Sequence, residues 1–151
     1  MLVVSPQCPY GDNWQYPAMV ERLHQLVAEV VVAYGIDPRK VYLTGFSMGG
    51  DGVWALGIAH PELFGALAPV GSWYENEGAV CVLRETPVWV FQGEKDEVVS
   101  KTHAQAMVDA LRQCGGQVRL TLYPEAGHVE SSRLAYEEEA LYSWLAEQKR
   151  R

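Results

Sequence analysis

Short apolar segments rich in β-branched residues alternate along this chain with segments whose apolar residues recur every three or four positions. The short segments predict five strands, at residues 2–5, 40–44, 66–70, 87–92 and 117–123. Strands that alternate with helices and are apolar on both faces are typical of a parallel sheet covered on both sides. We therefore predict an α/β fold of three layers around a mostly parallel, five-stranded sheet.

Helices are expected between these strands. The first has apolar residues at helical spacing from Val20 to Tyr34 and stops at Gly35. Further helices are predicted at residues 49–60, 101–114 and 136–149, the second of these ended by the Gly115-Gly116 pair. No linker or repeat interrupts the 151 residues, so a single domain over 1–151 is expected.

Charge and apolar content exclude several classes of partner. A formal net charge of -7 argues against nucleic acid, because phosphate backbones are bound by surplus Lys and Arg. No stretch approaches the roughly 20 apolar residues that span a bilayer, so no membrane partner is expected. The cysteines, Cys8, Cys81 and Cys114, form no CxxC pair and are odd in number. We predict free thiols, a cytoplasmic location, and no metal or cofactor.

The motif Gly45-Phe46-Ser47-Met48-Gly49 lies between a predicted strand and a predicted helix. A serine at such a sharp turn has a strained backbone, and glycines on both sides allow the close approach that the turn requires. The helix that follows directs its N-terminus at this point, so the amide of Met48 is placed to stabilise an oxyanion. Ser47 is the predicted nucleophile.

A serine nucleophile needs a base, and a histidine at the end of a later strand is the usual one. Of four histidines, His24 and His103 fall in helical patterns and His60 precedes a helix-ending proline. His128 follows the last predicted strand in the sequence Ala126-Gly127-His128 and is the predicted base.

An acidic residue should orient that imidazole, and the segment Gly93-Glu94-Lys95-Asp96-Glu97 follows the strand at 87–92. Ligands bind at the carboxyl ends of parallel strands, which favours this loop but not one residue in it. Asp96 is the first choice, and Glu94 and Glu97 remain alternatives on spacing alone.

The whole chain resembles the carboxyl-terminal part of α/β hydrolases of the carboxylesterase, phospholipase and dienelactone-hydrolase type. The matching segments are Val3-Val4-Ser5-Pro6-Gln7-Cys8-Pro9 with Trp14, Val41 to Gly50, Gly93 to Val99, and Ala126-Gly127-His128. In that family the serine, the aspartate before a Val-Val pair and the glycine-linked histidine form the catalytic triad. The resemblance thus implies Ser47, Asp96 and His128.

The chain departs from the family pattern at its beginning. It starts at what resembles the family's fourth strand, without the earlier loop, often HGxG, that supplies a second oxyanion amide. Losing one such donor typically costs about 2.7–4 kcal/mol of transition-state stabilisation. We expect a substitute from the loop Gln7 to Trp14, through Gln7 or the backbone of Cys8. An uncovered sheet edge also favours a homodimer.

The predicted function is hydrolysis of short-chain esters, small-molecule substrates, through an acyl-enzyme. Trp14, Trp73 and Tyr74 are candidate substrate-binding residues, although aromatic residues also commonly cover a core. The segment at residues 71–84 is long enough to form a small cap over the active site. Two alternatives stay open: a non-catalytic interaction module on the same fold, and a dienelactone hydrolase or peptidase with the same triad.

Overall fold

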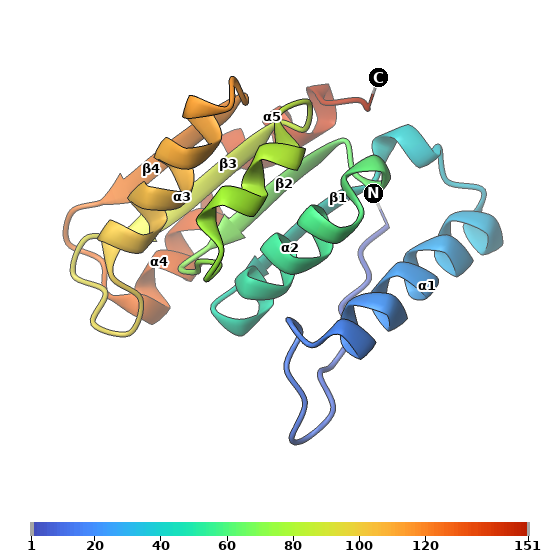
Figure 1. Cartoon of the computed structure of the whole chain (residues 1–151), viewed down its shortest axis with the longest axis horizontal. Coiled ribbons are helices and arrows are strands. Elements are labelled where there is room, and N and C mark those ends of the chain that lie inside the picture. The colour runs from blue at the N-terminus through green and yellow to red at the C-terminus, as the bar shows by residue number, and fades with distance from the viewer. Residues whose placement is uncertain (1, 151) are drawn as a thin grey trace.

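The computed structural model describes residues 2–150 and is built around one parallel sheet (Figure 1). Its strands are β1 (Tyr42–Phe46), β2 (Ala66–Val70), β3 (Val88–Gly93) and β4 (Val118–Tyr123). They lie in the order β1-β2-β3-β4, each parallel to its neighbour. Because sequence neighbours are also sheet neighbours, the segments after successive strands meet along one edge of the sheet.

The predicted α/β class is confirmed, but the sheet has four strands rather than the five expected. Residues 2–5 form no strand, and the side chains of Leu2, Val3 and Val4 are exposed. A run of three apolar residues matches a strand locally, yet strand formation depends on packing against a partner. Pro6 and Pro9 follow at once and offer no amide hydrogen to a sheet ladder.

One face of the sheet carries α1 (Pro17–Tyr34), α2 (Met48–Ala59), the 3₁₀ segment η3 (Glu77–Leu83) and α3 (Lys101–Gln113) (Figure 1). Their buried side chains form a cluster with Leu67, Val88 and Val90 of the sheet. Two further 3₁₀ turns, η1 (Pro38–Lys40) and η2 (Pro61–Leu63), precede β1 and β2. α2 is apolar nearly all round, consistent with its burial between the sheet and α1.

The opposite face is covered by α4 (His128–Glu137) and α5 (Glu139–Glu147). Here Ala135, Trp144 and Leu145 pack against Trp89 and Phe91 of β3. A single helix over 136–149 was expected, but the chain breaks at Glu138, whose backbone is extended (φ -76, ψ 105). The break separates α4 from α5, both of which pack on this face, and helical periodicity in the sequence does not reveal it.

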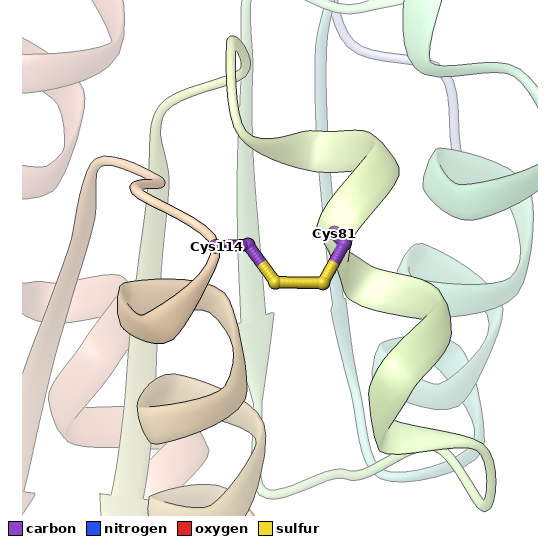
Figure 2. Close-up of a disulfide and its surroundings, with 2 residues drawn as sticks. All are labelled: Cys81 and Cys114. Atoms are coloured by element: carbon purple, nitrogen blue, oxygen red, sulfur yellow. A yellow bond between two sulfur atoms is a disulfide. The ribbon is translucent and has the colours of Figure 1, made fainter.

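Cys81 and Cys114 form a disulfide, so the prediction of three free thiols is wrong (Figure 2). Their Cα atoms lie 5.4 Å apart, and the bridge joins η3 to the residue that ends α3. An odd number of cysteines still allows one bridge and one free thiol, which is Cys8. The cysteines therefore no longer support the predicted cytoplasmic location. Within residues 2–150, no helix has the length and apolar character needed to cross a bilayer.

Candidate active site

Ser47 lies at the turn between β1 and α2 in a strained backbone conformation, with φ 54 and ψ -121. It is the one non-glycine residue with positive φ in the described part of the chain. The turn is tight: a Cβ atom at Gly45 would lie 2.3 Å from the carbonyl oxygen of Gly49. The amide of Ser47 donates to the carbonyl of Val70 at 3.0 Å, which ties the turn to the neighbouring strand β2.

The two glycines of the motif differ. A Cβ atom added at Gly49 would meet nothing within 4 Å, so the close approach does not require a glycine there. The expectation that both flanking glycines serve the turn is therefore correct for Gly45 and wrong for Gly49.

The structure brings Ser47, His128 and Asp96 into one hydrogen-bonded chain. His128 Nε2 lies 2.8 Å from Ser47 Oγ, and His128 Nδ1 lies 2.8 Å from Asp96 Oδ2. The three residues follow β1, β4 and β3 respectively, at the same edge of the sheet. The imidazole is 14% exposed and the carboxylate 0% exposed, so the chain runs from the interior to an accessible hydroxyl.

Asp96 is held by more than the histidine. Its Oδ1 accepts the amides of Val98 and Val99 at 2.9 and 2.8 Å, and its Oδ2 also accepts Gln92 Nε2 at 2.8 Å. Burial by itself would raise the pKa of Asp96, but the bonds from His128, the two amides and Gln92 outweigh burial and lower it. The carboxylate therefore stays ionised and fixed in orientation at neutral pH.

The two alternative acids do not reach the imidazole. Glu94 pairs with Lys101 at 2.7 Å, and Glu97 is exposed. The pair of amides that binds Asp96 comes from the Val-Val dipeptide that follows Glu97, so this dipeptide forms an Asx-type turn around the aspartate.

Room for the His128 ring comes from a glycine after β2. Gly71 has φ +54, and a Cβ atom there would lie 3.1 Å from the Phe46 ring and 3.5 Å from His128 Cε1. The Phe46 and His128 rings pack with centroids 4.6 Å apart. The imidazole thus has an aromatic ring on one side and backbone close by, which limits its rotation.

Asp51, in the first turn of α2, is a site residue that sequence reasoning missed. Its Oδ1 accepts a hydrogen bond from the backbone amide of Trp73 at 3.3 Å, and the side chain of Gln15 is near enough to lower its pKa. The bond to Trp73 joins the loop after β2 to the first turn of α2. Burial raises the pKa of Asp51 above its ordinary value, more than these contacts and the nearby charge of His128 lower it. An acid in a first helical turn is common, so the sequence carried no signal.

The two predicted oxyanion donors lie in different surroundings. Met48 is the first residue of α2, where amides have no intrahelical acceptor. Gln7 is exposed, in a segment without regular structure. The loop that follows it does approach α2, since Trp14 packs so closely on Gly52 that a Cβ there would lie 2.6 Å from the Trp14 Cβ.

The candidate substrate-binding aromatics are partly used in packing. Trp14 is buried against α2, and Tyr74 packs at the edge of the larger core cluster. Trp73 is half-buried and stacks on His103, with ring centroids 4.4 Å apart and planes 19° from parallel. Of the three, Trp73 lies nearest in sequence to Gly71 and is linked to the site through Asp51.

A parallel sheet, a serine at a strained strand-to-helix turn and a histidine and an aspartate after later strands together define an α/β-hydrolase fold. The model of the Dienelactone hydrolase family matches residues 12–148. The chain belongs to this family.

Solved and curated proteins give the same picture. A thermostable esterase superposes with a TM-score of 0.87 at 32% identity, over 96% of this chain and 43% of that one. A probable carboxylesterase of Oryza sativa subsp. japonica is 30% identical over 95% of this chain and 54% of its own length. An acyl-protein thioesterase 1 of Gibberella zeae is 28% identical over 70% of this chain and 47% of its own. The chain thus spans about half the length of the curated relatives it matches.

Proposed function

We propose that this chain is a serine carboxylesterase that hydrolyses short-chain esters through an acyl-enzyme on Ser47. The observation that supports this most is the hydrogen-bonded chain from Ser47 Oγ through His128 to Asp96, with 2.8 Å at both steps. Its relatives include a carboxylesterase and a thioesterase, and esters and thioesters are cleaved by the same acyl transfer.

The mechanism follows from these positions. His128 Nε2 takes the proton of the Ser47 hydroxyl as its oxygen attacks the ester carbonyl carbon, and Asp96 stabilises the imidazolium that forms. The oxyanion accepts a hydrogen bond from the backbone amide of Met48 at the start of α2. His128 then protonates the departing alcohol. Water, deprotonated by the same imidazole, attacks the acyl-serine. The imidazolium then returns that proton to Ser47 Oγ as the acid leaves.

In this proposal, the loop from Gln7 to Trp14 supplies the second hydrogen-bond donor to the oxyanion. The contacts of Trp14 with Gly52 and of Gln15 with Asp51 support it, because they hold this loop against the first turns of α2. The role of the loop is tested by measuring turnover of an activated ester by Gln7→Ala and by a loop-shortened variant. Full turnover in both variants would mean that the loop supplies no donor.

Turnover of p-nitrophenyl acetate by the wild type and by Ser47→Ala tests the function itself. Loss of the nucleophile is expected to lower kcat by about 10⁴-fold or more. A fluorophosphonate probe should label the wild type and leave Ser47→Ala unlabelled. Labelling of Ser47→Ala, or equal turnover by both proteins, would contradict the proposal. A wild type that neither turns over esters nor reacts with the probe would favour a non-catalytic interaction module.

A dienelactone hydrolase activity is the second candidate, favoured by the family match over residues 12–148. A lactone is an internal ester, so the same residues would open it, with the leaving alkoxide staying on the acyl group. Comparing kcat/KM across short esters, thioesters, lactones and peptides ranks the candidates. A peptide preference would contradict both.

We also propose that the protein is a homodimer. Strand β1 is an edge of the sheet, and Leu2, Val3 and Val4 expose apolar side chains. Exposed edges and apolar patches of this kind are commonly covered by a second copy. Light scattering is expected to give twice the 16.8 kDa chain mass, and a monomeric mass would contradict this proposal.

A further inference from the structure

Two histidines that the proposed mechanism does not use meet between α1 and the end of α2. The rings of His24, on α1, and His60, the residue that ends α2, lie 4.1 Å apart between centroids. Glu21 stands one helical turn before His24, with its Oε2 3.8 Å from His24 Nδ1. We infer that Glu21, His24 and His60 form a binding site for a divalent transition metal ion of the zinc type.

The unpaired Nδ1 atom of His24 favours a role as a metal ligand over simple stacking of the two histidine rings. This atom is buried and has no hydrogen-bond partner in the described structure, although a buried polar atom normally has one. A neutral imidazole nitrogen with a free lone pair is the donor that zinc takes from histidine. A cation bound by this nitrogen would give it the partner it lacks.

The geometry is close to what a metal requires. One donor atom from each of the three residues lies within 4.8 Å of the others. Tetrahedral zinc with bonds of about 2.0–2.1 Å brings its ligand atoms to roughly 3.3 Å from one another. The difference is within reach of side-chain rotation, because Glu21 is exposed and both histidines are partly exposed.

Glu62 borders the site without being one of its three donors. It lies in the turn after His60, with its Oε1 3.4 Å from His60 Nδ1, where it can orient that ring. Two imidazoles and the Glu21 carboxylate would leave the fourth position of a tetrahedral ion to water. Mixed nitrogen and oxygen ligands of this kind suit zinc, nickel and copper better than magnesium or calcium.

The site is far from the serine. Ser47 precedes α2 and His60 follows it, and the twelve residues of that helix span about 18 Å (Figure 1). A metal here would link α1 to the end of α2, so its effect should be on stability rather than on the chemical step. The inference does not depend on the proposed esterase activity.

Calorimetric titration of chelator-treated, non-reduced protein with zinc chloride tests the site. The wild type is expected to bind one equivalent. His24→Ala and His60→Ala should each weaken binding by about 100-fold or more, since even residues that only support a metal ligand change affinity by about 10–100-fold. Zinc at about 100 times the wild-type Kd should raise the wild-type Tm by roughly 5–10 °C and the Tm of the two variants by no more than about 2 °C.

Matched variants locate the binding. His103→Ala removes a partly buried, ring-stacked histidine outside the cluster and should bind zinc like the wild type, as should Cys8→Ser and His128→Ala. If His24→Ala or His60→Ala does not fold, Glu21→Gln, at an exposed position, decides, with an expected loss of at least about tenfold. Absence of zinc binding by the wild type, or binding that persists in the cluster variants, would overturn the inference.

Discussion

Asp51 and Asp96 are two carboxylates of the candidate site whose surroundings shift their pKa values in opposite directions. Asp96 accepts four hydrogen bonds, which lower its pKa despite burial, whereas burial dominates at Asp51 and raises its pKa. Asp96 is therefore the carboxylate suited to orient His128. Asp51 instead accepts the backbone amide of Trp73 and so ties the loop after β2 to α2.

The raised pKa of Asp51 gives a prediction on stability and pH. A group whose folded pKa is raised contributes stability below its unfolded pKa, and this contribution is lost as pH rises through the folded pKa. Asp51→Asn keeps an acceptor for the Trp73 amide but cannot ionise. The difference in free energy of unfolding, Asp51→Asn minus wild type, should thus be more positive at pH 7 than at pH 3. Urea denaturation at both pH values measures this.

Asp12→Asn, at an exposed aspartate, is the control for this comparison. If the free energy of unfolding of Asp51→Asn minus that of the wild type falls as pH rises, the prediction is contradicted. Asp51→Ala adds a second comparison, because it also removes the acceptor and should be less stable than Asp51→Asn at both pH values.

Residues with a distinctive sequence context could be placed from the sequence, and residues without one could not. Ser47 stood in a GxSxG motif between a strand and a helix, and His128 followed the last strand. For the acid, spacing indicated the loop after β3, with Asp96 as first choice and Glu94 and Glu97 as alternatives. The family resemblance then favoured Asp96, because spacing does not say which side chain turns inward. Gln92, near the end of β3, carries no sequence signal of its own, because its bond to Asp96 depends on tertiary structure.

At the scale of elements, the β1-turn-α2 unit is where backbone geometry serves the site most directly. The approach of Gly45 to the Gly49 carbonyl is a contact of backbone with backbone, which no side-chain rotation can relieve. Gly49, in contrast, has helical neighbours and open space where a Cβ would lie. The two glycines of one motif therefore have different reasons to be there.

Alanine at these two positions should have opposite effects. Gly45→Ala is expected to lower the free energy of unfolding by about 1–3 kcal/mol or more through overpacking. Gly49→Ala should leave it unchanged or raise it by up to about 1 kcal/mol, because alanine favours a helix over glycine. Urea denaturation midpoints of the two variants and the wild type measure these effects. A lower midpoint for Gly49→Ala than for Gly45→Ala would contradict the prediction.

Elements with strong internal signals were predicted closely. The helix expected at 101–114 is α3, at Lys101–Gln113, and the one expected at 49–60 is α2, at Met48–Ala59. The errors fall where long-range contacts decide the outcome. The segment at 2–5 has strand-like residues but no strand beside it, and the helix expected at 136–149 lacked a visible signal for the break at Glu138.

At the scale of the whole molecule, the Cys81–Cys114 bridge joins parts of the chain 33 residues apart. It connects η3 and α3, both of which pack into the larger core cluster. Pairing of cysteines this far apart depends on how the intervening β3 and α3 are arranged, so it was not available from the sequence. The bridge restricts the unfolded chain over a loop that includes β3 and Asp96.

Removing the bridge should destabilise the protein. Closing a loop of this length is worth about 3–4 kcal/mol in the chain-entropy model. The variant with both Cys81→Ser and Cys114→Ser, or the wild type in reductant, should show a free energy of unfolding lower by about that amount in urea. Cys8→Ser is the control, since Cys8 is not in a bridge. Equal midpoints for wild type with and without reductant would contradict this prediction.

The backbone of Ser47 has a consequence for how such a protein evolves. Its positive φ is strained for any residue with a Cβ, at about 1–3 kcal/mol, and glycine adopts it freely. Ser47→Gly should therefore be more stable than Ser47→Ala in urea denaturation, although both lack the nucleophile; equal stability would mean that the turn stores no strain. Under the proposed function, the geometry that turnover requires is one that selection for stability alone would remove.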